Sequence, residues 1–317
     1  MKPTAWLLLF LAWVPVAAQA VKDTVSTELS MPALPQGTLN GTLLAFKSKK
    51  AVPLVVIIAG SGPTDRNGNN PAMTNNSLKY LAETLARQGT ASFRYDKRGA
   101  GASRDAMVKE DSLTFETYIN DAVAWIALLK KDRRFSKIIV AGHSEGALVG
   151  MVAAEKTHAD GYISIAGAGK PAAQIIRQQL KAQPETIRTE AGKILDSLQA
   201  GKLVAQPNPM FAALFRPSVQ PYLVSWFKYD PAAEIKKLTV PVLIVQGTTD
   251  VQVGTDDAQT LAAAAPSATL VLVEGMNHVL KEAEADFQKN VATYNDPALP
   301  LKPELAAHLQ GFLKQFR

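Results

Sequence analysis

Residues 138–146 read Ile-Ile-Val-Ala-Gly-His-Ser-Glu-Gly, and this stretch decides the fold. The apolar residues at 138–141 predict a buried strand, and residues 146–158 have the spacing of a helix. A Gly-x-Ser-x-Gly sequence between a strand and a helix is typical of a sharp turn that lifts the serine hydroxyl above a sheet. The flanking glycines suit that turn because a side chain there would strike the neighbouring strand or helix. The pattern predicts that Ser144 is a nucleophile.

Strand and helix patterns alternate on both sides of this turn. The predicted strands are residues 53–59, 90–95, 137–141, 161–166, 240–245 and 268–273, and the predicted helices are residues 77–88, 115–131, 146–158 and about 303–316. A short antiparallel hairpin is expected around residues 39–43. The alternation predicts an α/β fold with a mostly parallel central sheet and helices on both faces.

The alternation stops at about residue 168. Residues 170–237 are rich in Gln, Ala, Leu and Lys, and they show helical patterns without a strand. Ligands of open α/β sheets bind at the carboxyl ends of the strands. We therefore expect this insertion to form a helical cap over that edge, and the alternative is a helical stretch that packs elsewhere.

A serine nucleophile needs a base, and the chain has four histidines. His143 adjoins the serine, so its side chain points the wrong way to take the serine proton. His158 falls at the far end of the helix after the turn, and His308 falls in the terminal helix. His278 remains, in a loop that follows the predicted strand 268–273 and therefore lies at the same sheet edge as Ser144. We predict that His278 is the base.

The base needs an acid that orients it, and Asp250 follows the predicted strand 240–245. Asp256 and Asp257 are close rivals, but acids at these positions suit the first turn of the next helix. With Asp250 the catalytic residues occur in the chain order Ser, Asp, His, which is typical of one particular class of serine hydrolases.

An oxyanion hole needs two backbone N–H donors. One is expected from Glu145, the residue after the nucleophile, and the other from Ser61 in the glycine-rich loop after strand 53–59. That loop is not a phosphate-binding loop, because no Gly-Lys-Ser/Thr follows it. Residues 65–70 resemble a calcium loop only in part, because the glycine is misplaced and the bidentate glutamate is missing. No metal is expected.

Composition excludes several other classes of function. The 317 residues include no cysteine, which excludes disulfides, thiolate metal sites and a cysteine nucleophile. The formal net charge is +6, but the basic residues are dispersed among acidic ones, so a nucleic-acid partner is not expected.

The first twenty residues have the pattern of a secretory signal peptide. Lys2 precedes an almost wholly apolar run at 5–16, and Ala-Gln-Ala at 18–20 fits the cleavage pattern. The run is shorter than the ~20 residues of a spanning helix, so no stable membrane anchor is expected. We expect cleavage near Ala20, a single mature domain of residues 21–317, and export to a periplasm or beyond.

The sequence resembles α/β-hydrolases of the bacterial esterase and serine aminopeptidase type. The resemblance is carried by residues 60–68 and 95–103, the turn at Ser144, and the loops of Asp250 and His278. It implies an α/β-hydrolase fold, a catalytic triad and no cofactor. Many relatives carry a histidine at the position of Ala59, and this departure alters the surroundings of the loop donor.

Three functions remain open. The first is ester hydrolysis through an acyl-enzyme formed on Ser144. The second is exopeptidase action on short peptides, which needs a carboxylate for the substrate's amino group; Glu185, Glu190 and Glu234 in the insertion are candidates. The third is a binding protein without catalysis, which the fold alone does not exclude.

Overall fold

The structure is a computed structural model that describes residues 24–33 and 35–317. The predicted signal peptide, residues 1–20, lies outside the described residues. Within the described ranges, no helix is long and apolar enough to cross a membrane.

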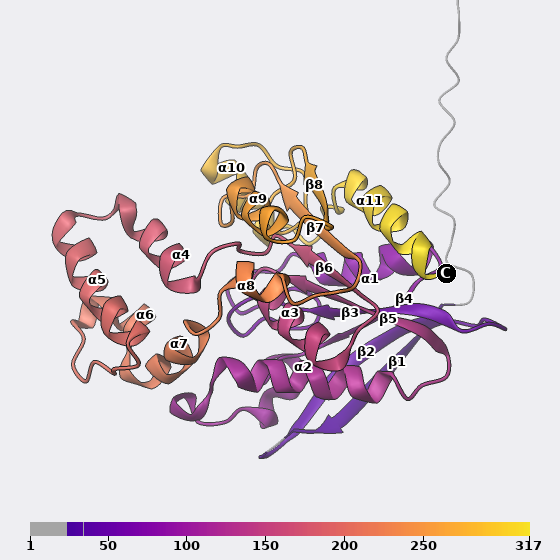
Figure 1. Cartoon of the computed structure of the whole chain (residues 1–317), viewed down its shortest axis with the longest axis horizontal. Helices are drawn as coiled ribbons and strands as arrows, with labels where there is room; N and C mark the ends of the chain where they lie inside the picture. The colour runs from indigo at the N-terminus through magenta and orange to yellow at the C-terminus, as the bar shows by residue number, and fades with distance from the viewer. Residues whose placement is uncertain (1–23, 34) are drawn as a thin grey trace, which may run out of the picture.

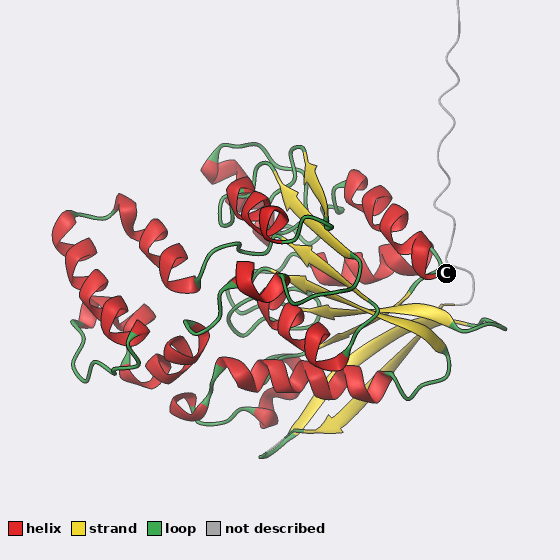
Figure 2. Ribbon diagram, viewed as in Figure 1, coloured by secondary structure: helices red, strands yellow, loops and turns green. Residues whose placement is uncertain are grey.

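A single mixed sheet lies at the centre of the molecule (Figure 2). Its strands are β1 (Thr24–Pro32), β2 (Thr38–Phe46), β3 (Val52–Ile58), β4 (Ala91–Tyr95), β5 (Phe135–His143), β6 (Gly161–Ile165), β7 (Val242–Gly247) and β8 (Thr269–Val273). They lie in the order β1-β2-β4-β3-β5-β6-β7-β8. The strands β3 to β8 are parallel, whereas β2 pairs antiparallel with β1 and β4. The predicted α/β class and mostly parallel sheet are confirmed.

Residues 39–43, where a short antiparallel hairpin is expected, all lie within β2, and its partner strand β1 is not predicted by the sequence. β1 and β2 pair from Thr24 opposite Phe46 to Pro32 opposite Thr38, well beyond the expected residues 39–43. β1 lies at the edge of the sheet, where its side chains are exposed or half-buried. It therefore lacks the continuous apolar run that marks a central strand.

Helices cover both faces of the parallel strands (Figure 1). Those outside the insertion are α1 (Ser77–Arg87), α2 (Phe115–Leu129), α3 (Glu145–Thr157), α9 (Thr255–Ala264), α10 (Phe287–Ala292) and α11 (Pro303–Leu313), with short 3-10 helices at Gly101–Ala106, Glu110–Ser112, Thr293–Asn295 and Lys314–Phe316. α1 and α11 share one apolar cluster with the sheet, and α2, α3 and α9 share another. Because both faces are covered, β4, β6 and β7 are buried along their whole length.

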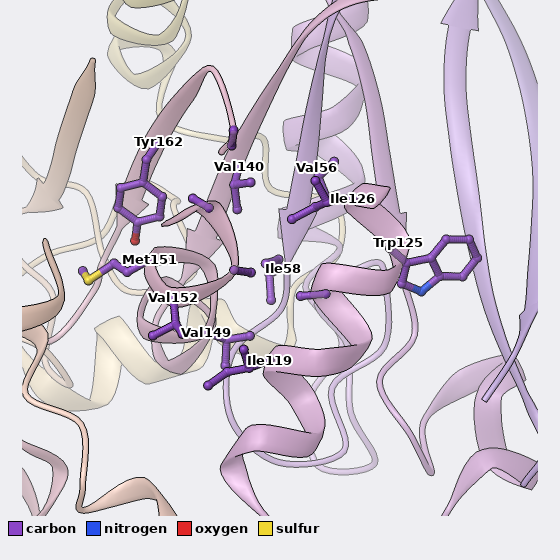
Figure 3. Packing of buried hydrophobic residues seen from close by; sticks show 14 of the residues in the cluster. Val56, Ile58, Ile119, Trp125, Ile126, Val140, Val149, Met151, Val152 and Tyr162 are labelled. Carbon is purple, nitrogen blue, oxygen red and sulfur yellow. The ribbon is translucent and has the colours of Figure 1, made fainter. Parts of the chain in front are cut away.

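The apolar core under α2 and α3 fixes the elements that meet at Ser144 (Figure 3). Val140 of β5, Val149 of α3 and Ile126 of α2 are buried together. The ring of Trp125 lies 4.6 Å from that of Phe93. Burial of each large apolar side chain stabilises the fold by roughly 1.5–3 kcal/mol. β5 and α3 are thus held rigidly on either side of the serine.

The insertion between β6 and β7 is helical, and we call its helices the cap. They are α4 (Ala172–Gln179), α5 (Glu185–Gln199), α6 (Ala212–Phe215), α7 (Gln220–Trp226) and α8 (Pro231–Ile235), with 3-10 helices at Leu180–Ala182, Pro209–Phe211 and Pro217–Val219. The helices α4 to α7 extend beyond the sheet (Figure 1) and share an apolar cluster that includes Leu195 and Phe215. Arg216 joins the cap to the segment before α2 through Glu110, with 2.9 Å between Nε and Oε2.

Candidate active site

Ser144 lies at the turn between β5 and α3. Its backbone has φ 56° and ψ −125°, a conformation that costs an L-residue roughly 1–3 kcal/mol. A Cβ on Gly142 would lie 2.1 Å from the Gly146 carbonyl oxygen, and a Cβ on Gly146 would lie 2.5 Å from that of Ala59. Only glycine fits either position, so the close packing of the turn explains both glycines around the serine.

The loops after β7 and β8 bring Asp250 and His278 together. Nδ1 of His278 lies 2.8 Å from Oδ2 of Asp250, and both side chains are buried. Oδ1 of Asp250 accepts hydrogen bonds from the backbone N–H groups of Gln252 and Val253, and Nε2 of Gln246 donates to Oδ2. This surrounding set of donors fixes the position of the carboxylate.

Asp250 is ionised and sets the tautomer of His278. Burial raises the pKa of Asp250, but the His278 imidazole and the backbone donors outweigh burial, so the pKa lies below its ordinary value. The carboxylate can only accept, so the neutral imidazole carries its proton on Nδ1 and leaves Nε2 as an acceptor. That tautomer is the one that a base for Ser144 requires.

The described residues include no hydrogen bond between Ser144 and His278, whose side chain bonds to Asp250 alone. Bonds between a nucleophile and its base are often long or poorly aligned before substrate binds. The proximity of His278 to the turn is instead visible through His143, the residue before the serine.

His143 contacts the predicted base. The rings of His143 and His278 lie 4.9 Å apart, and Nε2 of His143 is 2.8 Å from the backbone carbonyl oxygen of His278. Burial lowers the pKa of His143 to about 4, so the ring is neutral and donates from Nε2. His143 thereby ties the loop of the base to the turn. His158 lies at the end of α3 and His308 in α11, away from this contact.

The loop after β3 approaches the serine closely. A Cβ on Gly60 would lie 3.1 Å from the Cβ of Ser144. Ser61 and Glu145 line the same cavity as Ser144. Glu145 is the first residue of α3, where a backbone N–H has no partner within the helix. No described residue accepts a hydrogen bond from the Ser61 N–H. Both predicted donors are therefore available to an oxyanion beside Ser144.

A cavity of 230 Å³ lies between the turn and the cap. Its apolar lining includes Leu148, Ile175, Ile176, Leu214, Leu223 and Trp226. Lys170 also lines it, but this lysine is paired with Asp256 and lies 3.7 Å from Asp257. A larger groove of 520 Å³ adjoins residues 47–52 and contains none of the predicted site residues. The cavity at Ser144 is thus small, largely apolar and without an uncompensated cation.

The carboxylates predicted as amino-group ligands do not line this cavity. Glu185 and Glu190 lie on α5, and Glu234 is ion-paired with a neighbouring lysine at 2.7 Å. The acidic residue that lines the cavity is Glu145, and its Oε1 lies 3.5 Å from Nζ of Lys97. Neither this ion pair nor the His143 contact is predicted by the sequence, because both join segments that are distant along the chain.

Residues 72–217 match the serine aminopeptidase S33 family. This range contains Ser144 and ends before Asp250 and His278. Esterase EstD of Thermotoga maritima is 29% identical over 251 residues, which make up 78% of this chain and 59% of that protein. The chain therefore spans less than two thirds of the length of this curated relative.

Solved structures share the architecture over nearly the whole chain. Est1E from Butyrivibrio proteoclasticus with ferulic acid bound has a TM-score of 0.60 at 20% identity, covering 90% of this chain and 99% of that one. The α/β-hydrolase GrgF from Penicillium sp. sh18 has a TM-score of 0.57 at 18% identity, covering 92% and 99%.

The sheet order, the strained serine turn and the structural matches together define the class of fold: the chain has the α/β-hydrolase fold. In sequence it is similar to a bacterial esterase over 251 residues and to the serine aminopeptidase S33 family over residues 72–217.

Proposed function

We propose that this protein is a serine esterase that cleaves carboxylic esters through an acyl-enzyme. Ser144 is the nucleophile, His278 is the base and Asp250 orients the base. The observation that carries the proposal is the 2.8 Å contact between His278 and Asp250, in loops at the sheet edge where the strained Ser144 turn projects. The named esterases among the similar proteins support the same reaction.

The proposed reaction has two halves. Nε2 of His278 takes the Ser144 proton while Oγ bonds to the ester carbonyl carbon, and the N–H groups of Ser61 and Glu145 receive the charge on the carbonyl oxygen. The tetrahedral intermediate collapses, the C–O bond to the alcohol breaks, and His278 gives its proton to the leaving alkoxide. Water then loses a proton to His278 and attacks the acyl carbon, which releases the acid and restores the Ser144 hydroxyl.

The volume and the lining of the cavity favour small esters over peptides as substrates. Its 230 Å³ is below the ~300–1,000 Å³ of cavities that hold drug-sized ligands. Its apolar lining suits a short acyl or alcohol group. An aminopeptidase needs a carboxylate for the substrate's ammonium group, and the Glu145 carboxylate is compensated by Lys97. We therefore favour a small-molecule ester over a short peptide as the substrate.

The purified protein should hydrolyse p-nitrophenyl butyrate with a kcat/KM on the order of 10² higher than p-nitrophenyl dodecanoate, because the cavity cannot enclose the longer chain. Release of p-nitrophenol below the critical micelle concentration measures both rates. Alanine p-nitroanilide is the matched peptide-type substrate. Cleavage of this anilide at a kcat/KM equal to or above that of the butyrate ester would contradict the esterase proposal and favour aminopeptidase activity.

We also propose that the protein is exported and that residues 1–20 are removed. Support comes from Lys2, the apolar run at 5–16 and the small residues at 18–20. Fractionation of a bacterial host that expresses the full chain, followed by N-terminal sequencing, should find Val21 as the first residue of periplasmic or secreted protein. A cytoplasmic protein that begins at Met1 would contradict export.

A further inference from the structure

Lys97 is a buried cation that the proposed reaction does not use. It follows β4 in the turn at residues 96–99, and only 3% of it is exposed. Lysine is almost never this buried without partners, because desolvation of the ammonium group is costly. Burial lowers the pKa of Lys97, and the nearby Glu145 carboxylate opposes that effect. The partners of Lys97 therefore explain its presence in the interior.

Those partners belong to the two segments that supply the predicted oxyanion donors. Nζ of Lys97 donates a hydrogen bond to the backbone carbonyl oxygen of Gly60. The same ammonium group lies 3.5 Å from Oε1 of Glu145 and 4.8 Å from the ring centroid of Tyr118. One buried cation thus links the loop after β3 to the first residue of α3.

The contact with Gly60 acts on a particular peptide group. The carbonyl of Gly60 and the N–H of Ser61 belong to the same planar trans peptide, so they point in opposite directions. An ammonium group that holds the carbonyl oxygen therefore also fixes the direction of the Ser61 N–H. Hydrogen bonding at the oxygen also polarises the peptide and strengthens the N–H as a donor.

The contact with Glu145 acts on the second donor. The Glu145 side chain is buried, and burial together with the Glu145 carboxylate raises the pKa of Tyr118 on α2 and of Tyr222 on α7. Both tyrosines therefore stay protonated at neutral pH, and Lys97 is the cation that pairs with the carboxylate. The ion pair thus holds the side chain of the residue that lines the cavity beside Ser144 and is the second predicted donor.

We infer that Lys97 is a positioning residue for the oxyanion hole, which holds the Gly60–Ser61 peptide and Glu145 in the arrangement that stabilises the tetrahedral intermediate. This inference rests on the proposed serine hydrolase reaction. Lys97 itself does not touch substrate. Its effect is on the charge that develops in the transition state, so its loss lowers kcat and leaves ground-state binding almost unchanged.

The test replaces Lys97 with methionine, which keeps the length and packing of the side chain but removes the charge. With p-nitrophenyl butyrate we expect kcat to fall on the order of 10², as for the loss of one oxyanion donor, and KM to change less than about threefold. The affinity for 1-butaneboronic acid, which forms a tetrahedral adduct on a serine, should fall by a comparable factor. Lys97→Arg, which keeps a donor, should retain more activity than Lys97→Met.

Two further variants separate positioning from stability. Arg98→Met breaks a buried ion pair beside Lys97, where Nε and Asp121 Oδ2 are 2.6 Å apart. The hydrogen bonds of the Arg98 side chain go to Asp121 and Ala106, which lie outside the oxyanion segments. It should lower the thermal midpoint of unfolding with little change in kcat. The double variant Lys97→Met/Glu145→Gln removes the uncompensated carboxylate, so the midpoint should recover while kcat stays low.

The inference is overturned if folded Lys97→Met keeps kcat within threefold of the parent protein, or if the double variant recovers kcat together with stability. It is also overturned if Arg98→Met loses as much kcat as Lys97→Met. Failure of the proposed function is a different result, because the unmodified protein would then fail to hydrolyse the butyrate ester or to bind the boronic acid.

Discussion

Substitution of Ser144 by alanine should lower kcat for p-nitrophenyl butyrate by about 10⁶, as for the loss of a serine in other catalytic triads. The reason is chemical, because without Oγ no acyl-enzyme forms and water must attack the bound ester directly. Alanine has the same Cβ as serine, so it occupies the strained backbone at φ 56° without a new clash. We expect the thermal midpoint of unfolding to stay near that of the parent protein.

Covalent labelling gives the same prediction a readout that does not depend on the substrate chosen. A fluorophosphonate probe should label the parent protein with one equivalent and should leave Ser144→Ala unlabelled. Ser48→Ala, an exposed serine between β2 and β3, is the control and should be labelled fully. Equal labelling of the parent protein and Ser144→Ala would assign the nucleophile to another residue.

Substitution of Asp250 by asparagine should lower kcat by about 10⁴, as for the same change in a known triad. Oδ1 accepts from the N–H groups of Gln252 and Val253, so the amide oxygen of asparagine takes that position. The amide NH2 then faces Nδ1 of His278 and stabilises the tautomer with the proton on Nε2. A ring in that tautomer cannot accept the Ser144 proton.

Asp256→Asn is the matched control for Asp250→Asn, because Asp256 is the neighbouring acid that pairs with Lys170 at the first turn of α9. Its kcat should change by less than about threefold. Initial rates with p-nitrophenyl butyrate, measured on folded proteins, compare the two. A large loss in Asp256→Asn together with normal turnover in Asp250→Asn would move the role of orienting acid to Asp256.

The fold class could be predicted because its signals are local. Apolar runs such as residues 138–141 mark strands that are buried on both faces, and the glycines at 142 and 146 mark the turn that separates strand from helix. β1 was not predicted from the sequence, because an edge strand does not need a continuous run of apolar residues. Its pairing with β2 is decided by the hydrogen bonds of the sheet and not by its own composition.

The candidate site could be predicted in part, through elimination. Only four histidines are present, and the positions of three conflict with a role as base. The parallel sheet then explains why Asp250 and His278 are neighbours, because loops at the carboxyl ends of adjacent strands meet at one edge. The structure adds their 2.8 Å contact and the donors that hold Asp250.

The sequence by itself determined the class of fold, the serine turn and a short set of candidate residues, because each depends on chain-local geometry and on the chemistry of residue types. Only the tertiary structure decided the contacts of His143 with His278 and of Lys97 with Gly60 and Glu145. The same holds for the small apolar cavity under the cap. These features join segments far apart in the chain, and only the packing of the sheet, α3 and the cap brings them together.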